Sequence, residues 1–236
     1  MDEMCLSLNG ERLVLDQSGA LFWPSQETLV VADLHFEKGS AYARSGSLLP
    51  PYDTRETLAR LSSAVGRRRP NRVIALGDSF HDSGAGARLG DIERQILEHL
   101  SDVARFTWIT GNHDPEPPAW LSGEIAAEAR IGGLVFRHEP SRVFDMGEVA
   151  GHLHPCATVV RRGHGLRRRC FVSDGMRLVL PAFGAYAGGL DVRDAAIAGL
   201  FARSSIAYLL GARRVYAAPV DRRSAELFSN LLPTAL

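Results

Sequence analysis

Five short polar motifs stand directly after apolar runs of this sequence, and they consist of residue types that bind metal ions or transfer protons. They are Asp33-Leu34-His35, Gly77-Asp78, Gly111-Asn112-His113-Asp114, His138 and Gly151-His152-Leu153-His154. Alternate side chains of an extended strand point to the same side. Asp33 with His35, and His152 with His154, can therefore each direct two ligands toward one place. The spacing predicts a metal centre.

The mixture of donor atoms in these motifs indicates which ions they would bind. Carboxylates, imidazoles and a carboxamide together suit borderline to hard divalent ions such as Mn, Fe, Zn or Co, whereas oxygen donors alone would favour Mg or Ca. Seven candidate ligands exceed the needs of one ion and suit two ions bridged by a carboxylate, about 3.5 to 4 Å apart. The candidates are Asp33, His35, Asp78, Asn112, His138, His152 and His154. We expect two divalent ions as cofactors, Mn foremost, with Fe, Zn, Co or Ni as alternatives.

The elements that must position these motifs alternate between strand and helix in the first half of the chain. Apolar runs, each ending beside a motif, predict buried strands over Thr28–Ala32, Arg72–Leu76 and Phe106–Thr110. Apolar residues at helical spacing predict helices over Asp53–Val65 and Asp91–Val103. Asp53 with Glu56 three residues later resembles an N-cap with a capping box. A parallel sheet places its active site outside the carboxyl ends of its strands, where the motifs stand.

The second half of the chain has short apolar runs that stand too close together for crossover helices, so we expect them to pair largely antiparallel. These runs are Leu134–His138, Glu148–His152, Ala157–Arg161, Arg169–Ser173 and Arg177–Leu180. A helix over Val192–Leu210 and a strand over Arg214–Ala218 are expected to close the chain. Two stacked sheets with helices outside them are the economical arrangement of such elements.

The order of the motifs, DxH, GD, GNHD, H and GHxH, resembles the calcineurin-like metallophosphoesterase superfamily. The strings ADLHFEKG, LGDSFHD, GNHD, GHLHP and LPAFGAYAGG resemble its bacterial branch of ligase-associated DNA damage response endonucleases. The resemblance runs from about Leu29 to Ala218, and five ordered motifs are far more specific than any one of them. It implies one domain over residues 1–236 with an α/β fold, the four-layered αββα metallophosphoesterase sandwich of two stacked mixed sheets flanked by helices.

The resemblance also implies how the ligands divide between two ions. One ion would bind Asp33, His35 and His154. The other would bind Asn112, His138 and His152, and Asp78 would bridge both. A hydroxide between the ions would then attack phosphorus, which agrees with the general chemistry of two-metal sites.

Two further residues of the GNHD motif would act in catalysis. The resemblance implies that His113 donates a proton or a hydrogen bond to the phosphate, and that Asp114 orients the His113 imidazole. The physical chemistry agrees, because a cationic imidazole neutralises a leaving alkoxide. Many members of the superfamily have Asp three residues after the bridging Asp, where this chain has His81 followed by Asp82. The role of His81 is open between a substrate contact and a polar residue outside the chemistry.

Arginines around an expected hairpin provide candidate contacts to a phosphate backbone. Five of them stand within nine residues, on either side of a Gly-His-Gly turn, namely Arg161, Arg162, Arg167, Arg168 and Arg169. Solvated surface is the ordinary explanation of such a run, whereas its closeness to the GHLH motif favours substrate binding. Both interpretations stay open. A second run, Arg67–Arg69, is expected to complement a helix dipole, and His99 is expected to be an ordinary polar residue.

The composition limits the class of protein. Equal numbers of basic and acidic residues, 27 each, argue against coating nucleic acid by bulk electrostatics but do not exclude a local basic face. Three cysteines without CxxC spacing predict reduced thiols and no disulfide framework. No stretch reaches the roughly 18 apolar residues of a membrane span, and the first residues lack the pattern of a secretory signal. We expect a cytoplasmic protein with no membrane partner.

These observations predict a dinuclear-metal phosphodiesterase. The resemblance implies an endonuclease acting on DNA or another nucleic acid in repair, in functional association with DNA ligase, helicase and exonuclease. One alternative is a phosphoesterase for small nucleotides or phosphomonoesters, which the zero net charge favours and the arginine hairpin opposes. Another is a non-catalytic protein-binding module on the same fold, which would be expected to lose His113 or several ligands that are all present here.

Overall fold

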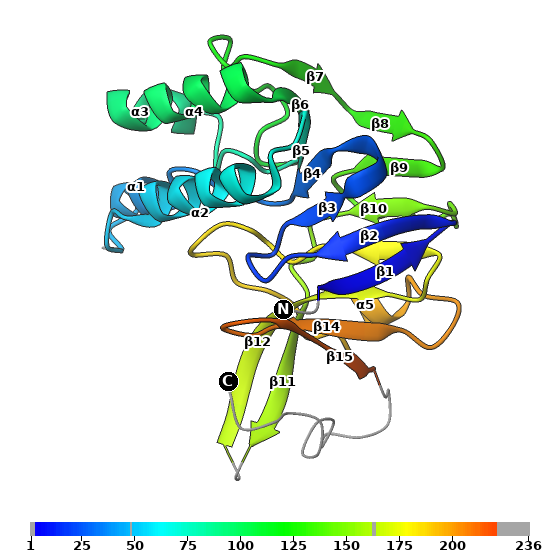
Figure 1. Ribbon diagram of the computed structural model, residues 1–236. Helices are drawn as coiled ribbons and strands as arrows, with labels where there is room; N and C mark the ends of the chain where they lie inside the picture. Colours follow the sequence, from blue (N-terminus) through cyan, green and yellow to red (C-terminus); the bar gives the residue numbers. More distant parts are fainter. Residues whose placement is uncertain (1–2, 48, 162–163, 221–236) are drawn as a thin grey trace.

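A computed structural model describes residues 3–47, 49–161 and 164–220 of the chain. Two β-sheets lie face to face, with helices packed on the outer face of the first sheet and a short helix beside the second (Figure 1). No helix in the described ranges is long and apolar enough to cross a membrane.

The first sheet contains seven strands in the order of the chain. They are β1 (Met4–Leu8), β2 (Glu11–Leu15), β3 (Leu21–Trp23), β4 (Thr28–Val31), β5 (Arg72–Leu76), β6 (Arg105–Ile109) and β7 (Glu124–Ala126). Strands β1 to β4 pair antiparallel, and β4 to β7 pair parallel. The three strands predicted to end beside motifs are confirmed as β4, β5 and β6, so their carboxyl ends meet at one edge.

The second sheet contains eight strands and mixes both directions of pairing. They are β8 (Glu128–Ile131), β9 (Leu134–Arg137), β10 (Glu148–Ala150), β11 (Cys156–Arg161), β12 (His164–Ser173), β13 (Arg177–Val179), β14 (Ile206–Leu210) and β15 (Val215–Pro219). Strand β10 pairs parallel with both β9 and β13, so the expectation of largely antiparallel pairing is wrong for it. The loop of residues 138–147 returns the chain to the start of β10 and makes a parallel crossover without a helix.

The helices of the first half confirm two predictions and correct one detail. Helices α2 (Asp53–Arg68) and α4 (Asp91–Val103) stand where helical spacing predicts them, with α1 (Lys38–Arg44) and α3 (Ala85–Arg88) in addition. Asp53 is not an N-cap. Tyr52 precedes the first helical residue, and the Asp53 carboxylate instead accepts a hydrogen bond from the backbone N–H of Gly39 at 2.9 Å.

The predicted helix over Val192–Leu210 is wrong. Only α5 (Ala195–Ala198) is helical, and the later part of the range is strand β14, which pairs with β12 and β15. Helix α5 ends at Gly199, and the segment Ile206–Leu210 gains ladder hydrogen bonds from two neighbouring strands, which outweigh a weak helical pattern. The last predicted strand is confirmed as β15, shifted by one residue.

Three apolar clusters hold the layers together. Leu58 and Leu61 of α2 pack against the first sheet. Consecutive residues of β4 face opposite ways, so Val31 joins this cluster while Val30 joins the one between the sheets, where it packs with Phe136 and other apolar residues. The third cluster lies on the outer face of the second sheet, beside α5. The expected four-layered αββα sandwich is confirmed, with the outer helical layer of the second sheet reduced to α5.

Candidate metal centre

The backbone of the motifs is left-handed at five candidate ligands. Positive φ angles of 46° to 68° occur at Asp33, His35, Asp78, His152 and His154. Such conformations cost about 1 to 3 kcal/mol each and persist only where surrounding contacts determine them. Strand β4 ends at Val31 and β10 at Ala150, so the paired ligands lie in turns beyond their strands. Their convergence therefore comes from left-handed turn residues and not, as predicted, from strand alternation.

The first cluster contains Asp33, His35 and His154, which two different sheets contribute. Their ligand atoms all lie within 4.8 Å of one another. The Nε2 atom of His154 lies 3.3 Å from Oδ1 of Asp33 and 3.4 Å from Nε2 of His35. Asp33 is fully buried, and both of its carboxylate oxygens accept the backbone N–H of His152. The turn after β10 is thereby tied to the turn after β4.

The second cluster contains Asp78, His138 and His152. The Nε2 atom of His138 lies 3.4 Å from Oδ2 of Asp78, 3.1 Å from Nδ1 of His152 and 3.0 Å from Oδ1 of Asn112. The Nδ1 atom of His138 donates to the carbonyl of Leu76 at 2.9 Å, which leaves Nε2 to face the cluster. Asn112, which the sequence also proposed as a ligand, therefore belongs to this group.

The donor set of both clusters fits divalent cations. Imidazole nitrogens face one another and face carboxylate oxygens at 3.1 to 3.4 Å, so a shared cation satisfies more of them than protons can. Burial, together with the charge of the nearby His154, lowers the pKa of His35 to about 2. His35 is therefore neutral at physiological pH, the form in which an imidazole binds a metal ion.

Asp78 stands between the two clusters. Its Oδ1 atom accepts the backbone N–H of His113 at 2.9 Å, while Oδ2 faces His138. Burial alone would raise the pKa of Asp78, but the hydrogen bond and charge of His138 and the His113 N–H lower it to about 2. Burial lowers the pKa of His138, and the carboxylates of Asp78 and Asp33 outweigh this and raise it to about 9.

The imidazole of His113 lies beside the ligands and is half exposed. Its Nδ1 donates to the backbone carbonyl of His81 at 2.8 Å, and its Nε2 lies 4.0 Å from Oδ2 of Asp78. Asp114 was expected to orient this ring, but the structure gives its carboxylate other partners. The described hydrogen bonds of the Asp114 carboxylate come from the backbone N–H groups of Ser79, Phe80 and Gly111. Asp114 thus holds two motif loops together, and the His81 carbonyl takes the position next to the imidazole.

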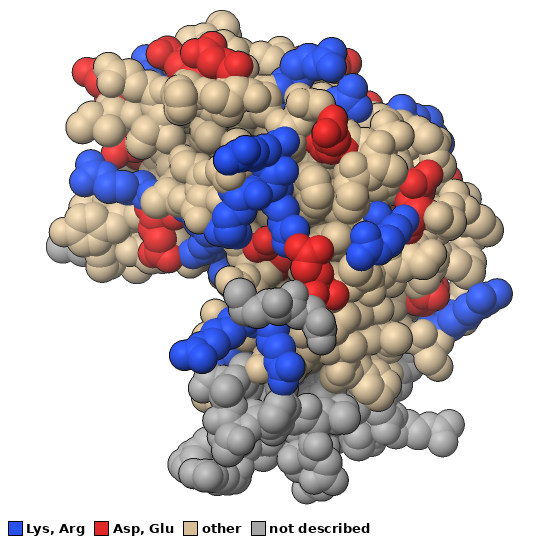
Figure 2. Space-filling model, in the orientation of Figure 1, with Lys and Arg blue, Asp and Glu red and all other residues tan. Residues whose placement is uncertain are grey.

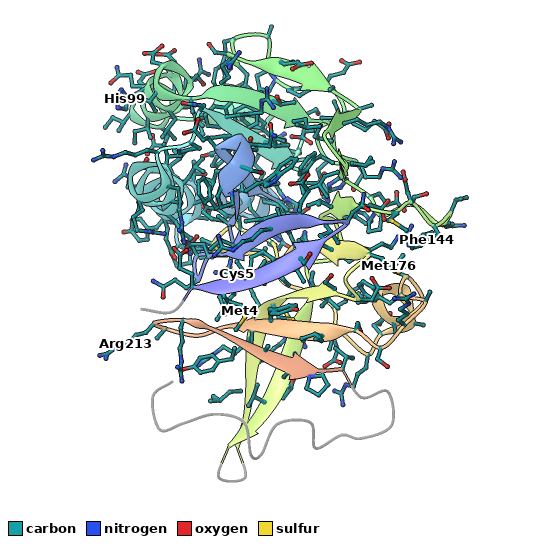
Figure 3. The ribbon with its side chains drawn as sticks, turned by 45° about the vertical axis from the view of Figure 1, so that its right-hand side comes forward. Met4, Cys5, His99, Phe144, Met176 and Arg213 are labelled. Atoms are coloured by element: carbon teal, nitrogen blue, oxygen red, sulfur yellow. The ribbon has the colours of Figure 1, made fainter. Side chains whose placement is uncertain are left out.

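The side chain of His81 also lies inside the centre. Its ring stacks on that of His113, with centroids 5.1 Å apart and planes at 20°, and meets the His35 ring edge-on at 5.4 Å. Tyr42, which the sequence did not indicate, lies beside His81 with ring centroids 5.9 Å apart. No motif of the sequence marks Tyr42, because its place in the site depends on how α1 packs. His99, labelled in Figure 3, is exposed on α4 and stands outside the centre.

Two of the hairpin arginines are bound to protein carbonyl groups. Arg169 donates to the carbonyls of Ala182, Phe183 and Gly184, and Arg167 donates to that of Gly189. The Arg169 guanidinium is thus held against loop carbonyls, whereas Arg167 is exposed and contacts the Gly189 carbonyl through its Nη2 atom.

The other arginines give a mixed result. Arg168 lies on the opposite face of β12 and bonds only weakly to the carbonyl of Arg167, at 3.4 Å. Arg161 ends β11 in a segment whose side chains are not described, and Arg162 lies outside the described residues.

Arg67 and Arg68 form ion pairs with Asp16. Figure 2 shows basic and acidic side chains interspersed on one face of the molecule, as expected from the zero net charge.

Comparison with known proteins agrees with this geometry. Residues 27–175 match the family model described as calcineurin-like phosphoesterase. Among solved structures, the crystal structure of Pseudomonas putida nuclease MPE is similar, with 31% sequence identity and a TM-score of 0.72. The similarity covers 93% of this chain and 100% of that chain. The comparison with curated proteins finds no significant match.

Proposed function

The chain belongs to the calcineurin-like phosphoesterase family and is a metal-dependent phosphoesterase, and on that premise we propose that it hydrolyses nucleic-acid phosphodiesters with two divalent ions. The observation that carries the proposal is the meeting of two ligand clusters beside the half-exposed imidazole of His113. The nuclease among the similar structures supports nucleic acid as the substrate class.

Each cluster would hold one ion. Asp33, His35 and His154 would bind the first ion, and Asn112, His138 and His152 the second, with Asp78 shared between them. Bound ions would supply positive charge to the phosphate and lower the pKa of an attacking water. We propose Mn as the ion, because the ligands mix imidazole nitrogen with carboxylate and carboxamide oxygen.

His113 would protonate the leaving oxygen. Its Nδ1–H is bonded to the His81 carbonyl, so the remaining nitrogen, Nε2, is the one that faces the centre and exchanges a proton. The stacked ring of His81 limits rotation of the imidazole and keeps Nε2 in that direction. A proton donor held this way serves a poor leaving group such as the alkoxide of a nucleotide sugar.

A small nucleotide or phosphomonoester stays a second candidate substrate. One observation supports it: loop carbonyls hold the Arg169 guanidinium, which leaves fewer hairpin arginines available to a phosphate backbone. The complete set of ligands and the family match favour an enzyme over a non-catalytic binding module. DNA as the preferred nucleic acid, endonucleolytic cleavage, a role in repair, and association with ligase, helicase and exonuclease rest on the motif resemblance and stay predictions.

Titration of the metal-stripped protein with Mn, Mg, Zn and Ni tests the proposal. The substrates are a nitrophenyl phosphodiester, the matching monoester, and labelled single-stranded and duplex DNA. We expect Mn to support cleavage of the diester and of DNA best. The exposed histidine variant His99→Ala serves as a control for loss of an imidazole outside the centre. Full activity in excess chelator, after exhaustive metal removal, would contradict the dinuclear proposal.

A further inference from the structure

A short segment over residues 180–185 joins the two sheets next to the first metal cluster. The backbone N–H of Leu180 donates to the carbonyl of Ala150 at 2.8 Å, where β10 ends. The N–H of Phe183 donates to the carbonyl of Ala32 at 2.7 Å, and that of Gly184 donates to the carbonyl of Asp33 at 3.1 Å. One segment therefore holds both turns that carry the ligands of this cluster.

Two arginines grip the opposite side of the same segment. The Nη1 atom of Arg169 donates to the carbonyls of Ala182 at 2.8 Å, Gly184 at 3.2 Å and Phe183 at 3.4 Å. The Nη1 atom of Arg60 donates to the carbonyl of Phe183 at 2.7 Å. We call Arg60 and Arg169 the arginine clamp. It joins α2 of the first sheet's outer layer and β12 of the second sheet to one stretch of backbone.

The clamp is electrostatically unusual because its guanidinium groups converge while carboxylates are scarce around them. Among the described ion pairs, Arg60 meets only Glu56, at 2.8 Å, and Arg169 meets no carboxylate. Burial and the charge of Arg60 lower the pKa of Arg169 to about 10, so Arg169 keeps its charge at neutral pH. Carbonyl dipoles of the segment provide the compensating negative potential.

Because each peptide bond is planar, the hydrogen bonds from the two arginines also fix the orientation of the N–H groups that bond the ligand turn. The carbonyl of Ala182 and the N–H of Phe183 belong to one peptide plane, and they point in opposite directions. Arg169 of the clamp donates to the Ala182 carbonyl, and the Phe183 N–H donates to the Ala32 carbonyl. The next plane repeats this arrangement between the Phe183 carbonyl, held by Arg60, and the Gly184 N–H, held by Asp33.

The backbone of residues 33–35, which accepts these hydrogen bonds, has a conformation that depends on such contacts. Asp33 and His35 are left-handed, with φ of 53° and 47°, and such residues persist only where neighbouring contacts determine them. Gly184 approaches so closely that a Cβ added to it would overlap the carbonyl oxygen of Leu34, between these two ligands. A rotation of either peptide plane would therefore move the ligand turn directly.

We propose that Arg60 and Arg169 are positioning residues for the metal site of Asp33, His35 and His154, acting through the peptide groups of residues 182–184. The proposal rests on the proposed function as far as the metal is concerned. It replaces the interpretation of Arg169 as a contact to substrate phosphate. It also gives the LPAFGAYAGG motif a physical role, as the strap that links the ligand turns of the two sheets.

The test compares Mn binding to the metal-free, full-length chain for wild type, Arg169→Met, Arg169→Lys and the neighbouring control Arg168→Met. Electron paramagnetic resonance counts free Mn and so gives the affinity of each site. We expect Arg169→Met to weaken one of two sites about 10-fold, the lower end of the loss for a direct partner of a metal ligand, because Arg169 acts through an intervening peptide, and to leave the other within about threefold. Arg169→Lys should recover most of the affinity, because a cation remains at the carbonyls. Arg168→Met should match wild type.

A second measurement works without metal. Hydrogen exchange of the metal-free protein should show faster exchange at the Phe183 and Gly184 amides in Arg169→Met, with the β12–β14 ladder unchanged. If Arg169→Met does not fold, Arg60→Met, a change at the helix surface, should give the same signature at smaller amplitude.

Three results would separate the explanations. Wild-type Mn affinity together with wild-type exchange in Arg169→Met would overturn the proposal. Unchanged metal binding with weakened DNA binding would also overturn it, and would make Arg169 a phosphate contact. A wild-type protein that binds fewer than two ions would refute the dinuclear function instead, while the exchange measurement would still decide whether the clamp holds the ligand turn.

Discussion

Replacement of His113 by alanine tests whether its imidazole donates a proton. The Nδ1 atom is bonded to the His81 carbonyl at 2.8 Å, and Nε2 lies 4.0 Å from Asp78 Oδ2, beside the ligand atoms. We therefore expect His113→Ala to keep both ions. A positioned acid contributes about 10²- to 10⁴-fold to turnover, which is about 2.7 to 5.4 kcal/mol of transition-state stabilisation, and we expect a loss within this range.

The assay compares leaving groups. Turnover is measured on DNA and on a nitrophenyl diester, with metal content determined by elemental analysis and His99→Ala as the control. The loss should be large on DNA, whose leaving alkoxide needs a proton, and smaller with nitrophenolate, which needs little protonation. Equal losses on both substrates would refute the acid role and would show that His113 stabilises phosphate charge. Loss of metal from the variant would contradict the expectation that His113 is not itself a metal ligand.

Three other changes test separate parts of the structure. Asp78→Ala should lose both ions by elemental analysis, because its carboxylate stands between the clusters; two retained ions would refute the shared position. Gly184→Ala should weaken Mn binding, since its Cβ would overlap the Leu34 carbonyl, whereas Gly188→Ala, just beyond the segment, meets open space and should match wild type. Asp16→Asn should lower the free energy of unfolding by about 2 kcal/mol at pH 7, measured in urea, because its carboxylate pairs with two arginines. Burial raises the pKa of Asp16, but hydrogen bonds from Ser18 and the arginines outweigh this and lower it, so its contribution is present at neutral pH and disappears as the pH falls below about 4. A difference from wild type that does not shrink as the pH falls below about 4 would contradict this cause.

Local patterns of the sequence carry the parts of the fold that were predicted. Buried strands β4, β5 and β6 are continuous apolar runs between helices with clear 3.6-residue spacing, and each run stops at a motif. The order of the motifs then places the ligands at one edge of a sheet. These features depend on neighbours in the sequence, so they can be read without knowing the tertiary structure.

The features that were missed depend on distant contacts. The segment Ile206–Leu210 becomes a strand because β12 and β15 offer ladder partners on both sides. Arg169 lies in a run of three arginines that looks solvated, and only the approach of residues 182–184 turns its guanidinium inward. Asp114 follows His113 in the chain, yet its carboxylate accepts hydrogen bonds from the backbone N–H groups of Ser79 and Phe80 in another loop. Strand β15 follows β14 directly in the chain, but the other partners stand well apart in the sequence.

The left-handed conformation of the candidate ligands explains why so many backbone hydrogen bonds join the loops of the metal centre. Five of the nine non-glycine residues with positive φ in the described ranges are candidate ligands, each at a cost of about 1 to 3 kcal/mol. The loops offset this cost by binding one another: the His35 N–H donates to the Asp78 carbonyl at 2.9 Å, and the His152 N–H donates to the Asp33 carboxylate. These bonds join the ligand loops to one another, so backbone contacts from neighbouring loops hold the left-handed ligands in place.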